Sequence, residues 1–264
     1  MNLKLEGKRA LVSGSSVGIG FAIAQALANE GASVIVNGRS AVRTKVAAKL
    51  ISDNGAAAKV YPFVGDLATA AGVEQLAAEI PEVDILVNNL GIYEPKPFQQ
   101  ITDEDWMRFF ETNVLSGVRL SRQYLPGMKT RNWGRIIFIS SESAVNIPVE
   151  MIHYGLTKTA QLALSRGLAE TTAGTGVTVN CVLPGPTRSE GVNDFISKMA
   201  HERGKTPAGI EEDFFKNVRP SSLLKRFATT EEVASLVAFV CSPLSSATNG
   251  AALRVDGGVI RSIL

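Results

Sequence analysis

Cysteine and histidine are scarce in this sequence, with two of each among 264 residues. Cys181 and Cys241 both stand in apolar surroundings, and neither belongs to a CxxC pair or to a Cys/His cluster with the spacing of a zinc site. A chain of this length buries enough surface to fold without a disulfide or a structural metal. We therefore interpret both cysteines as small buried side chains and expect no metal centre.

An excess of charge and long hydrophobic runs are also missing. The formal net charge is +2, and no basic cluster points to nucleic acid. No segment approaches the roughly 18 uncharged apolar residues that a membrane span requires. The first segment, Met1–Lys8, carries charges where a secretion signal needs an apolar core. These absences predict a cytoplasmic protein with neither nucleic acid nor a membrane as a partner, although the charge itself says little about what the protein binds.

Short β-branched segments alternate with longer helical ones along the chain. Segments such as Ala10–Val12 and Ile85–Val87 are apolar at every position, as in parallel strands covered by helices on both faces. No repeat or linker interrupts this alternation. It predicts a single doubly wound α/β domain over residues 1–264, with a parallel sheet of about seven strands. The predicted strands are Arg9–Ser13, Ser33–Asn37, Ala58–Phe63, Asp84–Asn88, Arg135–Ser140, Val177–Leu183 and Ala252–Val255, and the clearest helices are Ile19–Glu30, Val42–Asn54 and Tyr154–Thr172.

Residues typical of helix ends support these boundaries. Gly31 and Asn54-Gly55 follow helical segments, where a left-handed residue commonly ends a helix. Thr102–Asp105 and Thr229–Glu232 have the pattern of capping boxes, in which a hydroxyl and a carboxylate bind free backbone N–H groups. Each box predicts the start of a helix.

A helical insertion, about residues 186–220, follows the sixth predicted strand and contains no predicted strand of its own. Phe195, Ile196 and Met199 share one helical face, and Thr206-Pro207 resembles an N-cap followed by an N1 proline. An insertion of this length after a core strand is usually functional, often as a lid over a substrate. Packing on the surface or an oligomer contact is the alternative.

A glycine-rich loop, Gly14–Gly20, lies directly between the first predicted strand and helix. Glycines there let backbone amides approach a pyrophosphate at the helix N-terminus, where the helix dipole favours an anion. The spacing is G-x-x-x-G-x-G, which differs from the G-x-G-x-x-G of many dinucleotide-binding proteins. The residues predicted to contact a cofactor in this loop are Gly14, Ser16, Gly18, Ile19 and Gly20.

The same loop also fits a serine hydrolase. Gly14–Gly18 matches G-x-S-x-G, the nucleophile turn of α/β-hydrolases, with Ser16 as the nucleophile. Such an enzyme needs a histidine, and only His153 and His201 are available. The turn would also lie on the first strand. The hydrolase remains a remote alternative.

Six motifs occur in order along the chain. They are Ser13–Gly20, Asn88–Gly91, Asn113, Ser141 with Tyr154 and Lys158, Pro184-Gly185 and Asp256–Gly258. Together they resemble the motifs of the short-chain dehydrogenase/reductase family over nearly the whole chain. Two motifs depart from the family pattern, because Ser13 replaces the usual threonine of the glycine motif and Leu90 replaces an alanine. The resemblance implies a Rossmann-type fold and is strongest to bacterial 3-oxoacyl-acyl-carrier-protein reductases.

Tyr154 is the one tyrosine of four with a lysine four positions later, and these two positions share one helix face. An ammonium beside a phenol favours the phenolate, so we expect Lys158 to lower the Tyr154 pKa from about 10. Such a tyrosine exchanges a proton with a substrate hydroxyl near neutral pH. An ordinary exposed pair is the alternative. We expect His153 to be a wall or surface residue, because adjacent helix positions point in different directions.

Ser141 follows a strand, at the edge of the sheet where open α/β proteins bind ligands. The resemblance assigns Ser141 to the substrate carbonyl oxygen and Tyr154 to proton transfer as general acid/base. It assigns Lys158 to the nicotinamide ribose as well as to Tyr154, and Asn113 to a water that supplies protons to Lys158. Stabilising the negative charge that develops on the oxygen is what ketone reduction requires.

The end of the second predicted strand indicates the cofactor. By resemblance, Gly38 occupies the position where relatives that use NAD carry aspartate. Arg39 offers a planar charged group to the 2′-phosphate of NADP, and Ser40 adds a hydroxyl. A solvated arginine at a turn is the alternative. We expect NADP(H).

The remaining cofactor contacts come from the resemblance alone. It assigns Asp66 to the adenine amino group, with a helix-capping role as the alternative. It assigns Asn89 and Gly91 to the adenosine ribose, and Thr187 to the carboxamide. The further cofactor-binding residues that it implies are Leu67, Pro184 and Gly185.

These residues predict an NADP(H)-dependent carbonyl reductase that interconverts a ketone and a secondary alcohol. We expect a free small substrate, sugar-derived or otherwise, because the positions where the acyl-carrier-protein reductases present basic residues are Asn132 and Thr175, which are uncharged. An acyl-carrier-protein reductase and a non-catalytic NADP-binding regulator remain alternatives. The resemblance also implies a homotetramer that pairs helices Glu111–Lys129 and Tyr154–Thr172.

The insertion carries apolar side chains suited to close over a substrate of moderate hydrophobicity. These side chains are Phe195, Met199, Phe214 and Phe215.

Overall fold

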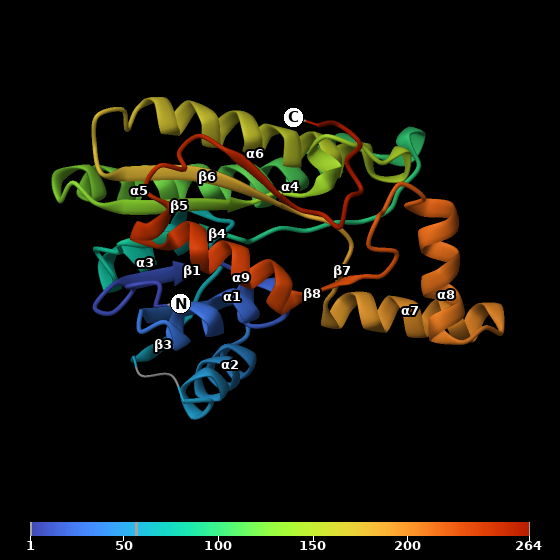
Figure 1. Ribbon diagram of the computed structural model, residues 1–264, viewed down its shortest axis with the longest axis horizontal. Coiled ribbons are helices and arrows are strands. Elements are labelled where there is room, and N and C mark those ends of the chain that lie inside the picture. Colours follow the sequence, from blue (N-terminus) through green and yellow to red (C-terminus); the bar gives the residue numbers. More distant parts are fainter. Residues whose placement is uncertain (1, 56–57, 264) are drawn as a thin grey trace.

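A parallel sheet of seven strands forms the centre of the computed structural model, which describes residues 2–55 and 58–263 (Figure 1). The strands lie in the order β3-β2-β1-β4-β5-β6-β9, and every neighbouring pair is parallel. All seven predicted strands are present, within two residues of their predicted ends, which confirms the doubly wound fold. They are β1 (Arg9–Val12), β2 (Ser33–Gly38), β3 (Val60–Val64), β4 (Ile85–Asn88), β5 (Gly134–Ile139), β6 (Val177–Pro184) and β9 (Ala252–Val255).

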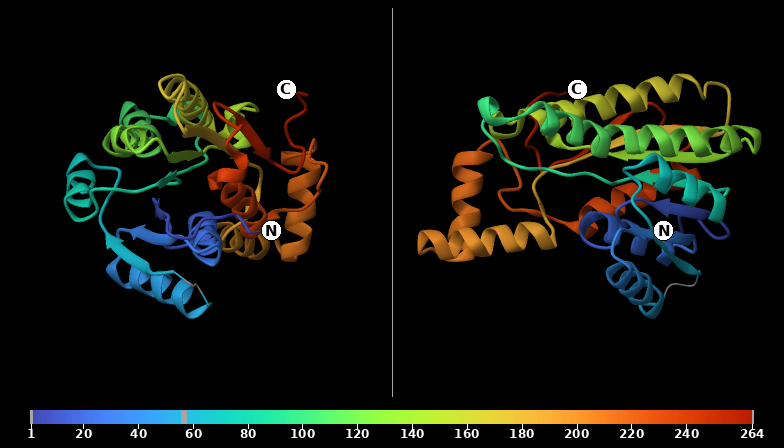
Figure 2. Two further views of the ribbon diagram at one scale, coloured as in Figure 1. Left: turned by 60° about the vertical axis from the view of Figure 1, so that its left-hand side comes forward. Right: turned by 180° about the vertical axis from the view of Figure 1, so that it is seen from behind.

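Helices cover both faces of the sheet, and alternate strand residues point into two separate cores. Ala10 and Val12 of β1 pack with α1 (Gly18–Asn29), α2 (Ala41–Asp53) and α9 (Thr230–Cys241). The neighbouring side chain, Leu11, packs into the second core, on the opposite face of the sheet. Three helices cover that face (Figure 2). These are α3 (Ala70–Glu79), α5 (Ser116–Thr130) and α6 (Ile152–Glu170). Strands that face helices on both sides are apolar throughout for this reason.

The helix ends form as predicted. Thr102 and Thr229 close capping boxes at the starts of α4 (Asp103–Phe110) and α9. Gly31 and Gly55 follow α1 and α2 with φ angles of +90° and +85°, which glycine adopts without a steric penalty. The shorter elements are η1 (Phe98–Gln100), η2 (Glu111–Leu115), η3 (Glu142–Ala144), η4 (Val149–Met151) and η6 (Pro243–Ser245). Among the described residues, no helix is long and apolar enough to cross a membrane.

The strand order reverses between β1 and β4, and this reversal positions the site. The chain runs from β1 to β2 and β3 on one side, then returns to β4 on the other. Loops that leave adjacent strands in opposite directions open a crevice at the carboxyl ends of the strands. The glycine loop after β1 and the Asn88–Gly91 segment after β4 both lie at this crevice.

The insertion leaves the body of the molecule as α7 (Glu190–Arg203), α8 (Pro207–Asp213) and the π-helical turn η5 (Phe214–Val218), which project beyond the sheet (Figures 1 and 2). Thr206 caps α8 by accepting a hydrogen bond from the Gly209 amide at 3.1 Å, as predicted.

One expectation about the insertion is wrong, because it does contain a strand. Thr187–Arg188 forms β7, which pairs with β8 (Ala228–Thr229). Two residues are too few to leave a periodic pattern in a sequence. The pairing instead depends on a segment far along the chain, through a hydrogen bond from the Ala228 amide to the Pro186 carbonyl at 2.9 Å.

Apolar side chains of the insertion pack in a cluster of their own together with Phe227. The Phe214 ring stacks on Phe227 with centroids 5.1 Å apart, and Phe215 meets Phe227 edge-on. Met199 packs against this cluster, and the Phe195 side chain lies outside the described part of the structure. The buried members are Ile196, Ala200, Ile210, Phe215 and Phe227. A segment that stands apart from the main cores needs an apolar cluster of its own to hold its shape.

Candidate active site

The glycine loop and the segment after β4 are held together by hydrogen bonds at the crevice. The Ser13 hydroxyl accepts hydrogen bonds from the amides of Asn89 and Leu90, both at 3.0 Å. The Asn89 side-chain amide donates in return to the carbonyls of Ser13 and Gly14, also at 3.0 Å. A side chain at Gly20 would collide with Asn89, because its Cβ would lie 2.5 Å from the amide nitrogen. Two motifs distant in sequence therefore form one rigid unit.

The N-terminus of α1 opens into this crevice without a side-chain cap. Val17 is the N-cap residue and supplies no acceptor, and the first turn of the helix holds no acidic residue. The amides of Gly18, Ile19 and Gly20 therefore stand at the positive end of the helix dipole, where they suit an anion such as a pyrophosphate. Gly14 and Gly18 both have φ angles of +61°, which is the conformation that requires glycine in this loop.

Two side chains that sequence reasoning did not identify support the loop from below. The Asn37 side chain accepts a hydrogen bond from the Gly14 amide at 3.0 Å and donates to the Gly65 carbonyl at 3.0 Å. The buried Ser15 hydroxyl donates to the Val12 carbonyl at 2.6 Å. In the sequence, the signal that could have identified Asn37 is a polar residue near the end of an otherwise apolar strand. Ser16, by contrast, stays partly exposed at the surface of the loop.

The arrangement of a serine hydrolase is not formed around Ser16. The His153 ring is fully buried, with its centroid 4.0 Å from that of Phe109 and 5.9 Å from that of Trp106. This makes His153 a wall residue, and burial lowers its pKa. His201 lies on the exposed surface of α7. Among the described residues, neither histidine has a hydrogen bond to Ser16.

Arg39 and Asp66 lie side by side at the ends of β2 and β3. The guanidinium and the carboxylate are 4.0 Å apart, and the Arg39 side chain is 77% exposed. Asp66 accepts a hydrogen bond from the Ala68 amide at 3.0 Å, whereas Thr69 is the N-cap of α3, so Asp66 is not the capping residue. Ser40 already uses its hydroxyl oxygen as a hydrogen-bond acceptor, because it caps α2.

Other residues assigned by the resemblance serve the local packing in the structure. The Leu67 side chain is buried in a core, so that only its backbone remains for a cofactor. Gly185, directly after Pro184, packs against the Asp256 carbonyl, where a side chain would not fit. The buried Thr187 hydroxyl donates to the Gly185 carbonyl at 2.9 Å.

Ser141, Tyr154 and Lys158 meet at the carboxyl edge of the sheet. Ser141 follows β5, whereas Tyr154 and Lys158 lie in the first two turns of α6. The Lys158 Nζ atom lies 5.6 Å from the centroid of the Tyr154 ring, so the two side chains share one side of the helix. This arrangement places a phenol, a hydroxyl and an ammonium beside the loop that suits a pyrophosphate.

The expected low pKa of Tyr154 is not found in the protein without a cofactor. Burial raises the pKa of Tyr154 to about 12, although a hydrogen bond with Ser141 acts in the other direction. Burial also lowers the pKa of Lys158 to about 8. The ammonium donates to the Ile139 carbonyl at 2.9 Å rather than to the phenol. Desolvation therefore has a larger effect on the Tyr154 pKa than the hydrogen bond with Ser141.

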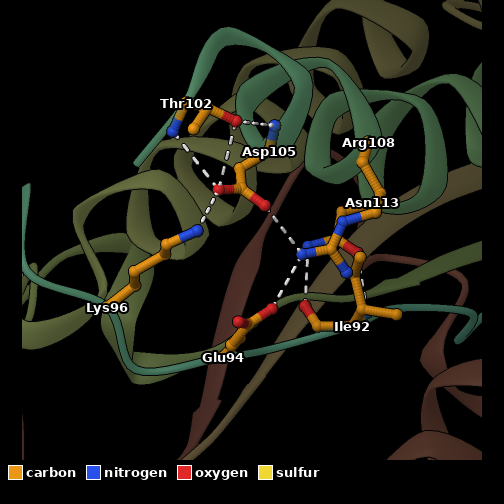
Figure 3. A network of polar contacts seen from close by, with 7 residues as sticks. All are labelled: Ile92, Glu94, Lys96, Thr102, Asp105, Arg108 and Asn113. Carbon is orange, nitrogen blue, oxygen red and sulfur yellow. Dashed lines mark hydrogen bonds and ion pairs between the residues drawn. The ribbon is translucent and has the colours of Figure 1, made fainter. Parts of the chain in front are cut away.

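Three hydrogen bonds hold the side chain of Asn113. Its amide nitrogen donates to the Ile92 carbonyl at 3.0 Å and its oxygen accepts from the Ile92 amide at 2.8 Å (Figure 3). The amide nitrogen also donates to the Thr157 hydroxyl at 3.0 Å. Both N–H groups are therefore occupied by acceptors of the protein itself. The Asn113 backbone carbonyl accepts a hydrogen bond from Gln161 at 2.6 Å. The assignment of Asn113 to a water that serves Lys158 stays a prediction.

Comparison with known proteins decides the family. A family model described as enoyl-(acyl carrier protein) reductase matches residues 14–260. The chain belongs to the short-chain dehydrogenase/reductase family. It is 50% identical to YvaG, an uncharacterised oxidoreductase of Bacillus subtilis, over the full length of both chains. It is 34% identical to the 3-oxoacyl-[acyl-carrier-protein] reductase FabG of Aquifex aeolicus, over 98% of this chain and 100% of that one.

One of the similar solved structures superposes over the whole chain. It is the L-sorbose reductase of Gluconobacter frateurii, crystallised with NADPH and L-sorbose. The two chains share 31% identity with complete coverage of each and a TM-score of 0.93. This agreement confirms the Rossmann-type fold.

In this short-chain dehydrogenase/reductase, the far end of the insertion is anchored beside Ser141. The Arg219 guanidinium donates to the Glu142 carboxylate at 2.9 Å and to the Glu150 carboxylate at 3.4 Å. Glu142 directly follows Ser141, and both it and Arg219 are buried. Burial raises the pKa of Glu142, and the nearby Arg219 charge opposes this. The contact joins residues 77 apart, so no local sequence pattern indicated it.

Tyr93 lies between Tyr154 and the start of the insertion. Its ring meets the Tyr154 ring edge-on with centroids 6.4 Å apart, and a Cβ on Gly191 would lie 3.5 Å from its hydroxyl. The segment that carries Tyr93 is tied to α4 by ion pairs of Lys96 with Asp105 and of Arg108 with Glu94 (Figure 3). Tyr93 thus forms a wall of the site that sequence reasoning did not identify.

Proposed function

We propose that this protein is an NADP(H)-dependent carbonyl reductase that interconverts a free small ketone and a secondary alcohol. The observation that carries this proposal is the meeting of Ser141, Tyr154 and Lys158 at the crevice, beside an uncapped helix N-terminus. A hydrogen-bond donor, a proton donor and an anion site are what hydride transfer to a ketone from a dinucleotide requires.

The residues at the crevice fit NADP(H). The free amides of α1 suit the pyrophosphate, and the exposed Arg39 suits a 2′-phosphate. Gly91 leaves space beside Lys158, since a Cβ there would lie 3.4 Å from the ammonium nitrogen, and a ribose hydroxyl would find a donor in that space. NADPH in the crystals of the L-sorbose reductase supports this choice. Bound NADPH supplies the hydride.

The protein's own side chains handle the carbonyl oxygen. We assign Ser141 to donate a hydrogen bond to this oxygen and Tyr154 to transfer its phenolic proton to it. A pKa of about 12 keeps the phenol protonated near neutral pH, which is the form that ketone reduction uses. In the reverse direction the phenolate is needed, so alcohol oxidation should rise with pH. Lys158 holds a positive charge close to the phenol.

A free substrate is favoured over an acyl carrier protein by the surface around Asn132. Asn132 uses its side chain to accept a hydrogen bond from the Gly176 amide at 2.8 Å. The nearby Arg131 pairs with Glu82 at 3.4 Å. The carboxylate offsets the charge of Arg131, which weakens the electrostatic steering of an acidic carrier. The ketohexose in the L-sorbose reductase crystals supports a polyhydroxylated ketone.

The test is NADPH oxidation with a panel of free ketones that includes L-sorbose and gluconate-derived keto acids. An acetoacetyl carrier protein and its free thioester analogue are compared in the same assay. We expect turnover of at least one free ketone and no advantage for the carrier-bound substrate. Tight NADPH binding without turnover of any substrate would favour a regulator, and a strong preference for the carrier protein would favour the acyl-carrier-protein reductase.

We further propose a homotetramer in which α5 and α6 pair between subunits. The mass of the particle in solution, measured by light scattering, tests this assembly. A monomeric mass across the working concentration range would contradict it.

A further inference from the structure

Gln161 bridges Asn113 and Lys158 in the interior of the site, although no sequence motif marks it. It lies on α6, one turn after Lys158, and its side chain is 2% exposed. Its amide nitrogen donates to the Asn113 carbonyl at 2.6 Å, and its oxygen accepts from the Lys158 ammonium at 3.3 Å. A backbone carbonyl only accepts, so the Asn113 contact fixes which end of the amide faces the lysine.

Two of the three N–H groups of Lys158 are thereby given fixed directions. One donates to Gln161 and one to the Ile139 carbonyl, and both acceptors are neutral. Neutral acceptors support an ammonium without cancelling its charge. The third N–H remains for the side where Gly91 leaves space and where Tyr154 lies.

We propose that Gln161 is a positioning residue that turns the Lys158 ammonium toward Tyr154 and the crevice. It occupies the link between Asn113 and Lys158 that the family resemblance assigned to a water. An amide side chain does not ionise near neutral pH, so this link orients the ammonium rather than conducting protons. The inference rests on the proposed function, because it concerns the same lysine.

The positive charge on Lys158 depends on these two acceptors, because few other groups near it could stabilise that charge. The titratable groups that face it are Tyr154 on its own helix and Cys181 on β6. Burial raises the pKa of Cys181 to about 12, so this thiol stays neutral. Replacing Gln161 with methionine removes an acceptor and disfavours the ammonium. Replacing it with glutamate adds a carboxylate and favours the ammonium.

The experiment follows the ε-carbon of Lys158 by NMR during a pH titration of the full chain without cofactor, with the resonance assigned from Lys158→Met. We expect Gln161→Met to lower the midpoint and Gln161→Glu to raise it, each by roughly one pH unit. Ser165→Ala is the control. Its hydroxyl is buried four positions further along α6 and has no hydrogen-bond partner among the described residues, so the midpoint should not move.

We expect the two Gln161 variants to shift the midpoint of the Lys158 titration in opposite directions. Either variant therefore tests the role of Gln161 if the other does not fold. A lowered melting temperature with an unmoved Lys158 midpoint in a folded variant means a structural role only and overturns the proposal. The titration does not depend on turnover. Absence of NADPH oxidation by the wild-type protein would therefore reject the proposed function, whereas an unmoved midpoint in an active enzyme would reject only the role of Gln161.

Discussion

The crevice between β1 and β4 and the insertion at residues 186–220 are stabilised in different ways. The crevice is held by short side chains that bond to the backbone, such as Ser13 and Asn89. The insertion is held by its own apolar cluster and by ion pairs, of Arg219 with Glu142 and of Arg188 with Glu211. The hydrogen bonds from side chains to the backbone fix the backbone of the crevice in one arrangement. The second kind of contact makes the insertion depend on its own apolar cluster and on its anchor at Glu142.

The largest expected effect lies on the crevice side, at Tyr154. Tyr154→Phe removes the proton donor but keeps the ring, so we expect kcat for ketone reduction to fall by about 10²–10⁴-fold. Affinity for NADPH should stay within a few-fold, because the glycine loop is unchanged. Steady-state kinetics and NADPH fluorescence titration measure the two quantities. Tyr93→Phe is the matched control, and it should leave kcat far less changed. Equal losses in the two variants would contradict the assignment.

Breaking the anchor of the insertion is expected to have the next largest effect. Arg219→Met leaves the buried Glu142 carboxylate without its partner, and we expect a loss of about 3–5 kcal/mol in the free energy of unfolding. Urea denaturation measures this loss. Adding Glu142→Gln should recover part of it, since the stranded charge is then removed. Arg226→Met, which breaks an exposed ion pair with Glu232, should change stability little. Equal losses in both arginine variants would contradict a special role for Arg219.

The cofactor preference is tested at the rim of the crevice. Arg39→Ala should weaken NADPH binding by about 10- to 100-fold, because a charge-assisted contact to phosphate is lost. NADH binding should change little, so the ratio of the two dissociation constants reports the role of Arg39. Lys49→Ala is the control, since Lys49 lies further along α2 and pairs with Asp53. Unchanged NADPH affinity in the Arg39 variant would reject the assignment.

The smallest expected effect compares matched helix caps in the two regions. Thr69 caps α3 beside the crevice, and Thr206 caps α8 in the insertion. We expect Thr69→Ala to lower the global free energy of unfolding by about 1 kcal/mol. Thr206→Ala should instead mainly speed hydrogen exchange within α8, because a projecting segment opens locally before the whole protein unfolds. An equal global loss in both variants would show that the insertion unfolds together with the sheet.

Local patterns predicted the parts of the molecule that depend on local physics. The strands, the capping boxes and the glycine loop follow from apolar runs, hydroxyl–carboxylate spacing and positive φ angles, which a short stretch of sequence encodes. The contacts of Asn37, Gln161 and Arg219 were not predicted, because each joins residues that only the folded chain brings together.

The pKa of Tyr154 and the packing of the insertion also depend on the whole fold. A lysine four positions away indicated a low pKa, but burial of the phenol has the larger effect. Phe214 and Phe215 pack around Phe227, which lies beyond the predicted segment, so no pattern within that segment indicated this cluster.

The most direct test of the central claim follows a deuterium label from NADPH to product. NADPH deuterated on either face of its transferring nicotinamide carbon is mixed with a ketone that the enzyme reduces, and the alcohol is examined by mass spectrometry. We predict that one of the two labelled cofactors places a single deuterium on the carbinol carbon, whereas heavy water with unlabelled NADPH places none there. Label that reaches this carbon from solvent, or from neither form of the cofactor, would contradict hydride transfer to the carbonyl.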